Sequence, residues 1–184
     1  MHRERARLDC RAVARPMDAL AEADFMPSEP LIDFEKVDLA RVVATREDIL
    51  GKIRQRGRFA LLDGILKFDG EKGLVVGFKD IRADDWWATD HIPGRPIFPG
   101  VLVCEAAAQL CSFDYLRQHT LPEGGFLGFG GMNETRFRGV VQPECRLVLA
   151  ARPERLRSRM FVYVAQGFVE REMVFETEIL GILV

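Results

Sequence analysis

Residues 101–116 constrain the fold of this 184-residue chain more than any other segment, because apolar side chains occupy nearly every position of the run. The run follows Pro99-Gly100 and stops before the sequence Leu-Pro-Glu-Gly-Gly at 121–125. Proline is favoured in the first turn of a helix, where its missing N–H is not needed. We therefore predict a helix over 101–116, and a helix that is apolar on every side is a buried one.

The segments on both sides of this helix have the character of strands. Asp69-Gly70 predicts a hairpin turn between the first two of them. Strands that do not alternate regularly with helices favour an α+β fold with an antiparallel sheet, and the apolar helix would lie inside the curl of that sheet. The predicted strands cover residues 59–68, 74–81, 126–129, 135–141, 146–151, 159–169 and 173–184.

The remaining segments are less regular. Residues 48–54 are predicted as a short helix, whereas residues 86–99 contain three prolines and are expected to be irregular. We expect residues 1–45 to form an N-terminal extension, disordered or partly helical. Residues 46–184 are expected to form one domain, which is a length sufficient for a sizeable core.

Charge and composition exclude several classes of protein. A net charge of −2 argues against a nucleic-acid partner, because phosphate binding usually requires a basic excess. No apolar run approaches the roughly 20 residues that a membrane-spanning helix needs, so no membrane partner is expected. The four cysteines include no Cys-x-x-Cys pair, and we expect reduced thiols in a cytoplasmic protein. The three histidines lack metal-ligand spacing, and no metal site is expected.

Glu105 is a candidate catalytic residue because it places a carboxyl group within the apolar helix. Taking a carboxylate out of water is costly, and burial favours the protonated form that a general acid needs. Gln109 lies one helical turn later and could donate a hydrogen bond to it. The alternative is that Glu105 faces solvent or pairs with an arginine.

The start of the helix is the second candidate feature. The N–H groups of Gly100 and Val101 would point along the positive end of the helix dipole, where they could hold a carbonyl oxygen that gains negative charge. The alternative is an ordinary helix cap. His91 lies just before the proline-rich loop, which could bring its imidazole back to the helix start. A histidine near a loop is otherwise a common surface residue.

Together these residues form the pattern His-x-x-Gly-x-Pro-x-x-Pro-Gly-x-x-x-x-Glu-x-x-x-Gln. It resembles the signature of the 3-hydroxyacyl-acyl-carrier-protein dehydratases of the FabZ/FabA family. Residues 56–63 and 135–141 are similar to two further segments of that family, and the resemblance runs from about residue 48 to the C-terminus. The matching positions are His91, Gly94, Pro96, Pro99, Gly100, Glu105 and Gln109.

The sequence departs from the family at several positions near this pattern. Asp90 stands where the family usually has a glycine before its histidine, and Trp86-Trp87 replaces a Phe-Phe pair. Gln55 stands in place of a histidine, and Gly57-Arg58 replaces Tyr-Pro. The matching histidine and glutamate themselves are retained.

The resemblance implies a hot-dog fold, in which a curved antiparallel sheet wraps around the central helix. It implies that His91 takes the α-proton of a 3-hydroxyacyl thioester and that Glu105 protonates the departing hydroxyl, without a cofactor, to give a trans-2-enoyl thioester. Gly100 would donate its N–H to the thioester carbonyl. A glutamate at position 105 resembles the simple dehydratases rather than the dehydratase–isomerases.

The resemblance also implies partners. Acyl carrier protein would deliver the substrate, and two subunits would pair so that each site takes its histidine from one and its glutamate from the other. Some members of the family assemble as a trimer of dimers. We expect Phe98, Gln109 and Phe137 to contact the substrate. Arg136 and Arg138 are candidates for binding the acidic carrier, although both could simply lie on a solvated strand face.

Two other functions remain open on the sequence. A hot-dog thioesterase would hydrolyse the thioester and would not need the pairing of His91 with Glu105. A catalytically silent hot-dog protein would bind acyl carriers without reaction, and the departures between Trp86 and Asp90 make this alternative relevant.

Overall fold

The computed structural model describes residues 28–70 and 73–184. Residues 1–27 of the predicted extension therefore lie outside the described residues. The elements in chain order are η3 (Phe34–Lys36), β1 (Ala44–Thr45), α1 (Arg46–Leu50), η4 (Gly57–Phe59), β2 (Gly64–Asp69), β3 (Leu74–Ile81), α2 (Trp87–Asp90), α3 (Gly100–Gln118), β4 (Leu127–Phe137), β5 (Cys145–Arg157), β6 (Met160–Val169) and β7 (Glu172–Leu183).

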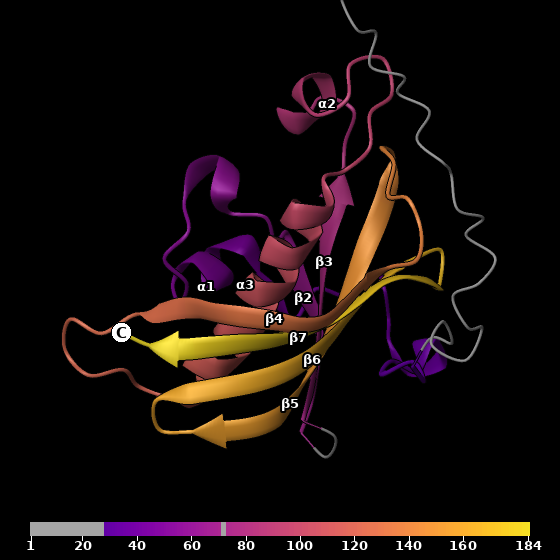
Figure 1. Cartoon of the computed structure of the whole chain (residues 1–184). Helices are drawn as coiled ribbons and strands as arrows, with labels where there is room; N and C mark the ends of the chain where they lie inside the picture. The colour runs from indigo at the N-terminus through magenta and orange to yellow at the C-terminus, as the bar shows by residue number, and fades with distance from the viewer. Residues whose placement is uncertain (1–27, 71–72) are drawn as a thin grey trace, which may run out of the picture.

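The strands form one antiparallel sheet, in the order β1-β2-β3-β5-β6-β7-β4, that curls around α3 (Figure 1). This confirms the predicted α+β hot-dog fold, and α3 matches the predicted buried helix. The helix lies very close to β3, because a Cβ atom added at Gly77 would come within 2.9 Å of the Leu110 side chain. The described residues contain no helix long and apolar enough to cross a membrane.

Both faces of the sheet centre are covered. On the inner face, Val75 and Leu149 belong to the core that surrounds α3. On the outer face, the neighbouring residues Val76 and Val148 belong to a second apolar cluster. The segment before β1 supplies part of that cluster, since Ile32 is only 5% exposed. Residues 28–40 thus pack on the face of the sheet opposite α3 (Figure 1).

The C-terminal strands differ from the prediction in β5, which continues to Arg157 rather than ending at residue 151, and in β4. The predicted strands 126–129 and 135–141 are one strand, β4, and Val141 lies beyond its end. The register of β4 against β7 shifts twice, between Phe129 and Gly131 and between Asn133 and Arg136. Residues 130 and 134–135, which interrupt the apolar pattern, lie at these two bulges. A bulge leaves extra residues unpaired without ending the strand, so β4 is continuous.

The N-terminal half of the domain also differs from the prediction in detail. The helix predicted over 48–54 is α1, which begins earlier because Thr45 and Asp48 form a capping box. The segment 86–99, predicted as irregular, contains the short helix α2 before its prolines. The strand predicted over 59–68 starts only at Gly64. The reason for this late start lies in the site described next.

Candidate active site

The start of α3 exposes backbone donors beside an aromatic ring. Pro99 is the N-cap, and no side chain caps the helix. Within the described residues, the N–H groups of Gly100 and Val101 have no hydrogen-bond acceptor. The ring of Phe137 covers this point so closely that a Cβ atom added at Gly100 would lie 3.0 Å from it. The arrangement can hold an oxygen that carries partial negative charge.

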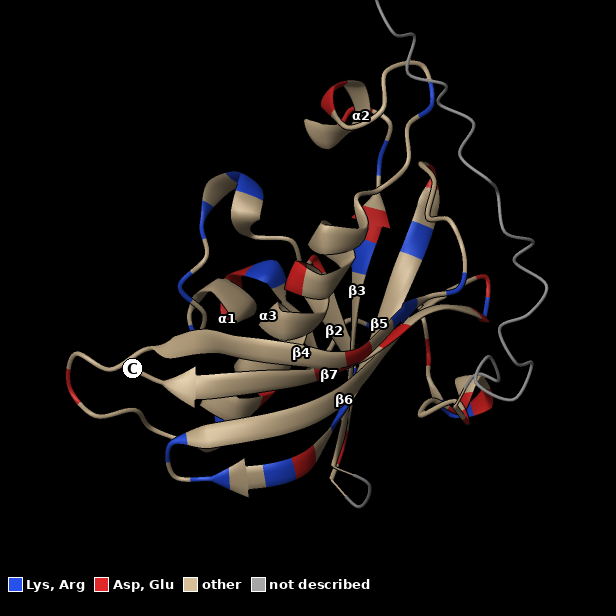
Figure 2. Cartoon of the chain, in the orientation of Figure 1, with Lys and Arg blue, Asp and Glu red and all other residues tan. Residues whose placement is uncertain are grey.

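Val101 is an exception to the predicted burial of the helix. Its side chain is 75% exposed, and Phe137 beside the helix start is 54% exposed. Two apolar side chains are therefore exposed at the helix start within a single chain, where the first turn of α3 carries no charged residue (Figure 2).

His91 is held by its own loop. It is the C-cap of α2, and its N–H donates to the carbonyl of Trp87 at 2.9 Å. Its ring Nδ1 lies 2.9 Å from the carbonyl oxygen of Ile97. A carbonyl can only accept, so Nδ1 is the protonated nitrogen. In its neutral form the ring has this tautomer and presents an unprotonated Nε2, which is the nitrogen that a base requires.

Glu105 is partly buried and receives hydrogen bonds from two side-chain amides. Gln109 Nε2 donates to Glu105 Oε1 at 2.8 Å, which confirms the predicted contact one turn along the helix. Gln55 Nε2 donates to the same oxygen at 3.1 Å. No ion pair to Glu105 occurs among the described residues. The alternative in which an arginine neutralises Glu105 thus finds no support in this chain.

Gln109 connects the helix to the chain segment that follows η4. Its Oε1 accepts from the N–H of Leu61 at 3.0 Å, and its Nε2 also donates to the carbonyl of Phe59 at 2.6 Å. The side chain is 0% exposed. These backbone groups bond to Gln109 rather than to a neighbouring strand, so β2 cannot begin at residue 59. Because Leu61 N–H only donates, the atom facing it is the amide oxygen, and the amide nitrogen must face Glu105.

A second carboxyl group in α3 provides a useful contrast. Asp114 is 2% exposed, and its Oδ2 accepts from the Tyr163 hydroxyl at 2.8 Å. Its Oδ1 pairs with Arg117 at 3.0 Å. Asp114 is thus a compensated buried charge, as structural carboxylates usually are. Glu105 differs because its described donors are neutral amides, and it lies in the second turn of the helix, nearer to its open end than Asp114.

The other predicted site residues lie in different surroundings. Phe98 is 2% exposed and packs edge-on against Trp87, with ring centres 5.1 Å apart, so it belongs to the core beneath α2. Arg138 donates to the carboxylate of Glu176 and is largely buried. Arg136 is more exposed and pairs with Glu134 at 2.9 Å. The structure brings together Gly100 with Phe137, and Glu105 with Gln109, but within the described residues of one chain His91 forms no hydrogen bond with Glu105.

The site lies within a region that matches a known family. The family model described as the FabA-like domain matches residues 53–178, which is well over half of the chain. The chain belongs to the FabA-like family. This FabA-like chain is 35% identical over 136 residues to the 3-hydroxyacyl-[acyl-carrier-protein] dehydratase FabZ of Syntrophobacter fumaroxidans, covering 72% of this chain and 89% of that protein. It is 37% identical over 135 residues to the FabZ of Herpetosiphon aurantiacus, covering 72% and 92%.

Solved structures support the same fold for the FabA-like chain. The dehydratase heterocomplex ApeI:P of Xenorhabdus doucetiae contains a chain that superposes with a TM-score of 0.62 at 11% sequence identity. The superposition covers 78% of this chain and 93% of that chain. At so low an identity the likeness establishes the hot-dog architecture and nothing about chemistry.

Gln55 is the site residue that sequence reasoning missed in this FabA-like chain. It was visible only as a departure, an amide in place of a histidine, with no indication of its target. The structure places it on the loop after α1, from which its side chain reaches Glu105 across 50 residues of sequence. Glu105 is consequently held from two sides.

Proposed function

We propose that this chain removes water from 3-hydroxyacyl thioesters carried by acyl carrier protein, giving trans-2-enoyl thioesters for fatty-acid synthesis. The protein is then a hydro-lyase with His91 as its base and Glu105 as its acid. The observation that carries the proposal is the setting of Glu105, a partly buried carboxyl group whose described donors are only the amides of Gln55 and Gln109. The proposed role requires a carboxyl group that can give a proton to the substrate, and among the described residues Glu105 has no ion pair.

The thioester carbonyl would bind at the start of α3. Its oxygen accepts a hydrogen bond from the N–H of Gly100, with the N–H of Val101 and the helix dipole beside it. Removal of the α-proton pushes negative charge onto this oxygen, giving an enolate-like state. Donors already in place stabilise that charge without reorganisation, and such electrostatic stabilisation is usually the largest contribution to catalysis.

His91 would remove the α-proton with Nε2. The hydrogen bond from Nδ1 to the carbonyl of Ile97 fixes the tautomer and keeps the ring oriented. As the ring becomes positively charged, the same carbonyl continues to accept from Nδ1–H. The loop that carries three prolines thus joins His91 to the helix start and also supplies the Ile97 carbonyl that orients the imidazole ring.

Glu105 would protonate the departing 3-hydroxyl group, which leaves as water. Oε1 accepts from two amides, and the oxygen that accepts in a protonated carboxyl group is the carbonyl oxygen. The transferable proton therefore lies on Oε2. In one turnover His91 gains a proton and Glu105 loses one. Transfer from the imidazolium to Glu105 through water restores the site, and the mechanism uses no cofactor.

The acyl chain needs an apolar space close to Glu105. A cavity of about 310 Å³ lies between the loop after α1 and the second half of α3. Its lining is mixed, with apolar side chains such as Leu116 and Leu121 beside polar ones such as Gln55 and Arg54. We assign the acyl tail to this cavity, with Phe137 beside the carbonyl end. Phe98 would support the site through its packing on Trp87, and Gln109 would support it through Glu105.

We propose a homodimer in which each site takes His91 from one protomer and Glu105 from its partner. The apolar side chains exposed at the helix start support such burial. The edge strand β4 offers a further surface, with Phe129 55% exposed. Three such dimers could combine into a hexamer. Arg136 is the better of the two predicted arginines for contact with carrier protein, because Arg138 is committed to Glu176.

The test is incubation of the protein with the N-acetylcysteamine thioester of 3-hydroxybutyrate while enoyl absorbance is followed. Appearance of the enoyl product supports the dehydratase. Release of free thiol without enoyl product would instead support a thioesterase. If no reaction occurs and the protein nevertheless binds acyl carrier protein in a separate binding assay, the result would support a silent carrier-binding protein and refute the proposal.

A further inference from the structure

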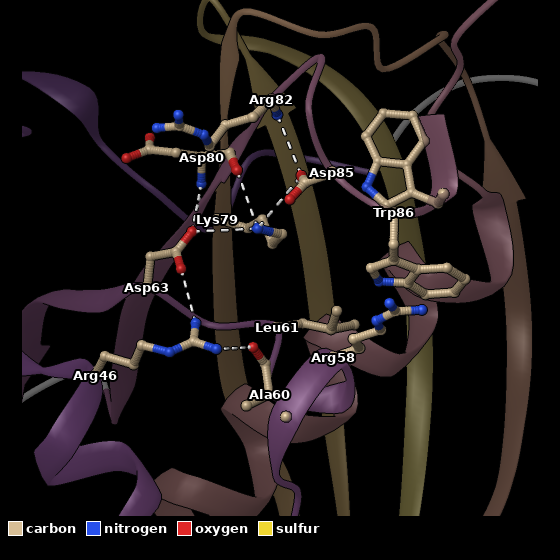
Figure 3. Close-up of a pocket in the computed structure, with 12 residues that line it drawn as sticks. Arg46, Arg58, Ala60, Leu61, Asp63, Lys79, Asp80, Arg82, Asp85 and Trp86 are labelled. Atoms are coloured by element: carbon tan, nitrogen blue, oxygen red, sulfur yellow. Dashed lines mark hydrogen bonds and ion pairs between the residues drawn. The ribbon is translucent and has the colours of Figure 1, made fainter. Parts of the chain in front are cut away.

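A second cavity lies next to the proposed site and takes no part in the mechanism above. It has a volume of about 490 Å³ and opens between η4, the end of β3 and the start of α2 (Figure 3). Four cationic side chains, three carboxylates and both tryptophans of the chain line it. We call it the tryptophan cavity. Its lining carries one more cation than carboxylates, so it favours an anion.

One side of the tryptophan cavity is neutralised from within. Lys79 lies 3.4 Å from Asp63 and 3.8 Å from Asp85, and Arg46 lies 2.9 Å from Asp63. Figure 3 shows these ion pairs on the side away from Trp86. These ion pairs balance the charges deeper in the cavity, because Asp63 and Asp85 each lie beside a cationic side chain. The charges available to a ligand are therefore those at the rim.

The rim carries arginines and an indole. Arg58 is exposed and has no hydrogen bond or ion pair to any of the described residues. Arg82 pairs with Asp84 at the surface, where both side chains are well exposed. Trp86 is 37% exposed, and Figure 3 shows it on the same side of the cavity as Arg58. A guanidinium group beside a flat aromatic surface suits a phosphate ester with an organic arm.

The second tryptophan supplies an independent sign of a missing ligand. Trp87 lines the cavity and is only 2% exposed. Its Nε1 is the one buried side-chain polar atom without a hydrogen-bond partner among the described residues. Buried donors are nearly always paired, and leaving one unpaired is costly. The atom has less than 1 Å² of accessible surface, so an acceptor oxygen in the cavity would satisfy it only after a small shift of the indole or of the cavity wall.

We propose that the tryptophan cavity binds the phosphate ester of the phosphopantetheine arm that carries the thioester. Arg58 and Arg82 would pair with the phosphate, the Nε1–H of Trp87 would donate to an oxygen of the ligand, and Trp86 would cover the arm. The inference rests on the proposed function for the identity of the arm. Coenzyme A and acyl carrier protein both present this phosphate.

The position of the cavity agrees with this assignment. Its wall includes Ala60 and Leu61, and on the helix side of that segment Gln109 bonds to Leu61 and to Glu105. Trp87 and His91 belong to the same turn of chain, since the N–H of His91 donates to the carbonyl of Trp87. In the proposed dimer, an arm anchored in the cavity thus begins next to the turn that carries His91 of one shared site and to the segment that supports Glu105 of the other.

Trp86 and Trp87 are the only tryptophans of the chain, so its tryptophan fluorescence reports on this cavity. We expect 4′-phosphopantetheine to change the fluorescence saturably and pantetheine, which lacks the phosphate, to bind at least tenfold more weakly. Arg58→Ala should weaken phosphopantetheine binding about fivefold, the value of one exposed ion pair. Arg155→Ala removes another exposed arginine and should leave binding unchanged. Equal binding of both compounds, no binding, or no effect of Arg58→Ala would overturn the inference.

Kinetics separate this inference from the proposed function. The 3-hydroxybutyryl thioesters of N-acetylcysteamine, phosphopantetheine, coenzyme A and acyl carrier protein are compared in the wild type and in Arg58→Ala. Turnover of the N-acetylcysteamine thioester tests the dehydratase, because this substrate lacks the phosphate. The phosphate-bearing thioesters should have a higher kcat/KM than the N-acetylcysteamine thioester. If this difference is smaller in Arg58→Ala than in the wild type, it supports phosphate binding in the tryptophan cavity. Turnover of all four with no such difference would refute the cavity and leave the dehydratase intact. Preference between coenzyme A and carrier protein identifies the source of the phosphate.

Discussion

Replacement of Gln109 by leucine would separate its structural role from its effect on Glu105. Leucine fills a similar volume but leaves the N–H of Leu61 and the carbonyl of Phe59 without the partners that they have at 3.0 and 2.6 Å. A buried polar group left unpaired costs about 1–3 kcal/mol, and one of these two groups is only part-buried, so we expect a loss of about 3 kcal/mol. For a chain of this length that corresponds to a fall of about 6–12 °C in melting temperature.

The assay is urea denaturation of Gln109→Leu beside Gln55→Ala at one protein concentration. The side chain of Gln55 bonds only to Glu105 among the described residues and is partly exposed, so its loss should cost under about 1 kcal/mol. Each variant removes one of the two amides that donate to Oε1 of Glu105, and we expect kcat to fall about a hundredfold in Gln109→Leu and about tenfold in Gln55→Ala. Wild-type stability of Gln109→Leu, or equal destabilisation of the two variants, would refute the reasoning.

Gly100→Ala should lower kcat/KM about tenfold with little loss of stability. The new methyl group would lie 3.0 Å from the exposed Phe137 ring and would push that ring across the amide donors. Unchanged kcat/KM would contradict the role given to this glycine. Burial alone would raise the pKa of Glu176, but its hydrogen bonds with Ser28 and Arg138 outweigh burial and lower it below 4.5. The stability that Glu176 contributes is therefore present above that pH and is lost as pH falls through the lowered pKa. The difference in unfolding free energy between wild type and Glu176→Gln, about 2 kcal/mol at neutral pH, should shrink on acidification, and a constant difference would refute this. Burial raises the pKa of the Cys111 thiol, so iodoacetamide should label the less buried Cys145 first in peptide mapping; the opposite order would contradict the packing of α3.

The sequence predicted what depends on local pattern. The helix over 101–116 was recognised because its apolar character is continuous, and the structure extends it only to Gly100–Gln118. The contact between Glu105 and Gln109 was predictable because residues four apart share one face of a helix. The antiparallel sheet was predictable from the order of the elements, because strands that do not alternate regularly with helices favour antiparallel pairing. One buried helix also requires a sheet that curls around it.

Features that depend on distant partners could not be predicted. Residues 59–63 read as strand, but Gln109 takes the hydrogen bonds of Phe59 and Leu61, and only the folded chain brings it there. The segment before β1 read as an extension, yet Ile32 and Val37 are buried against the outer face of the sheet. No local sequence pattern indicates that the outer face of the sheet is apolar and is buried by this segment.

The central claim is that one imidazole and one carboxyl group from different protomers form each site. The direct measurement is the dehydratase activity of His91→Ala and Glu105→Ala subunits, each alone and then co-expressed. Each variant alone should be inactive. In a mixed dimer with shared sites, one site loses both groups and the other keeps both, so random pairing should restore about a quarter of wild-type activity. Activity in either variant alone, or no recovery in the mixed dimers, would contradict the account.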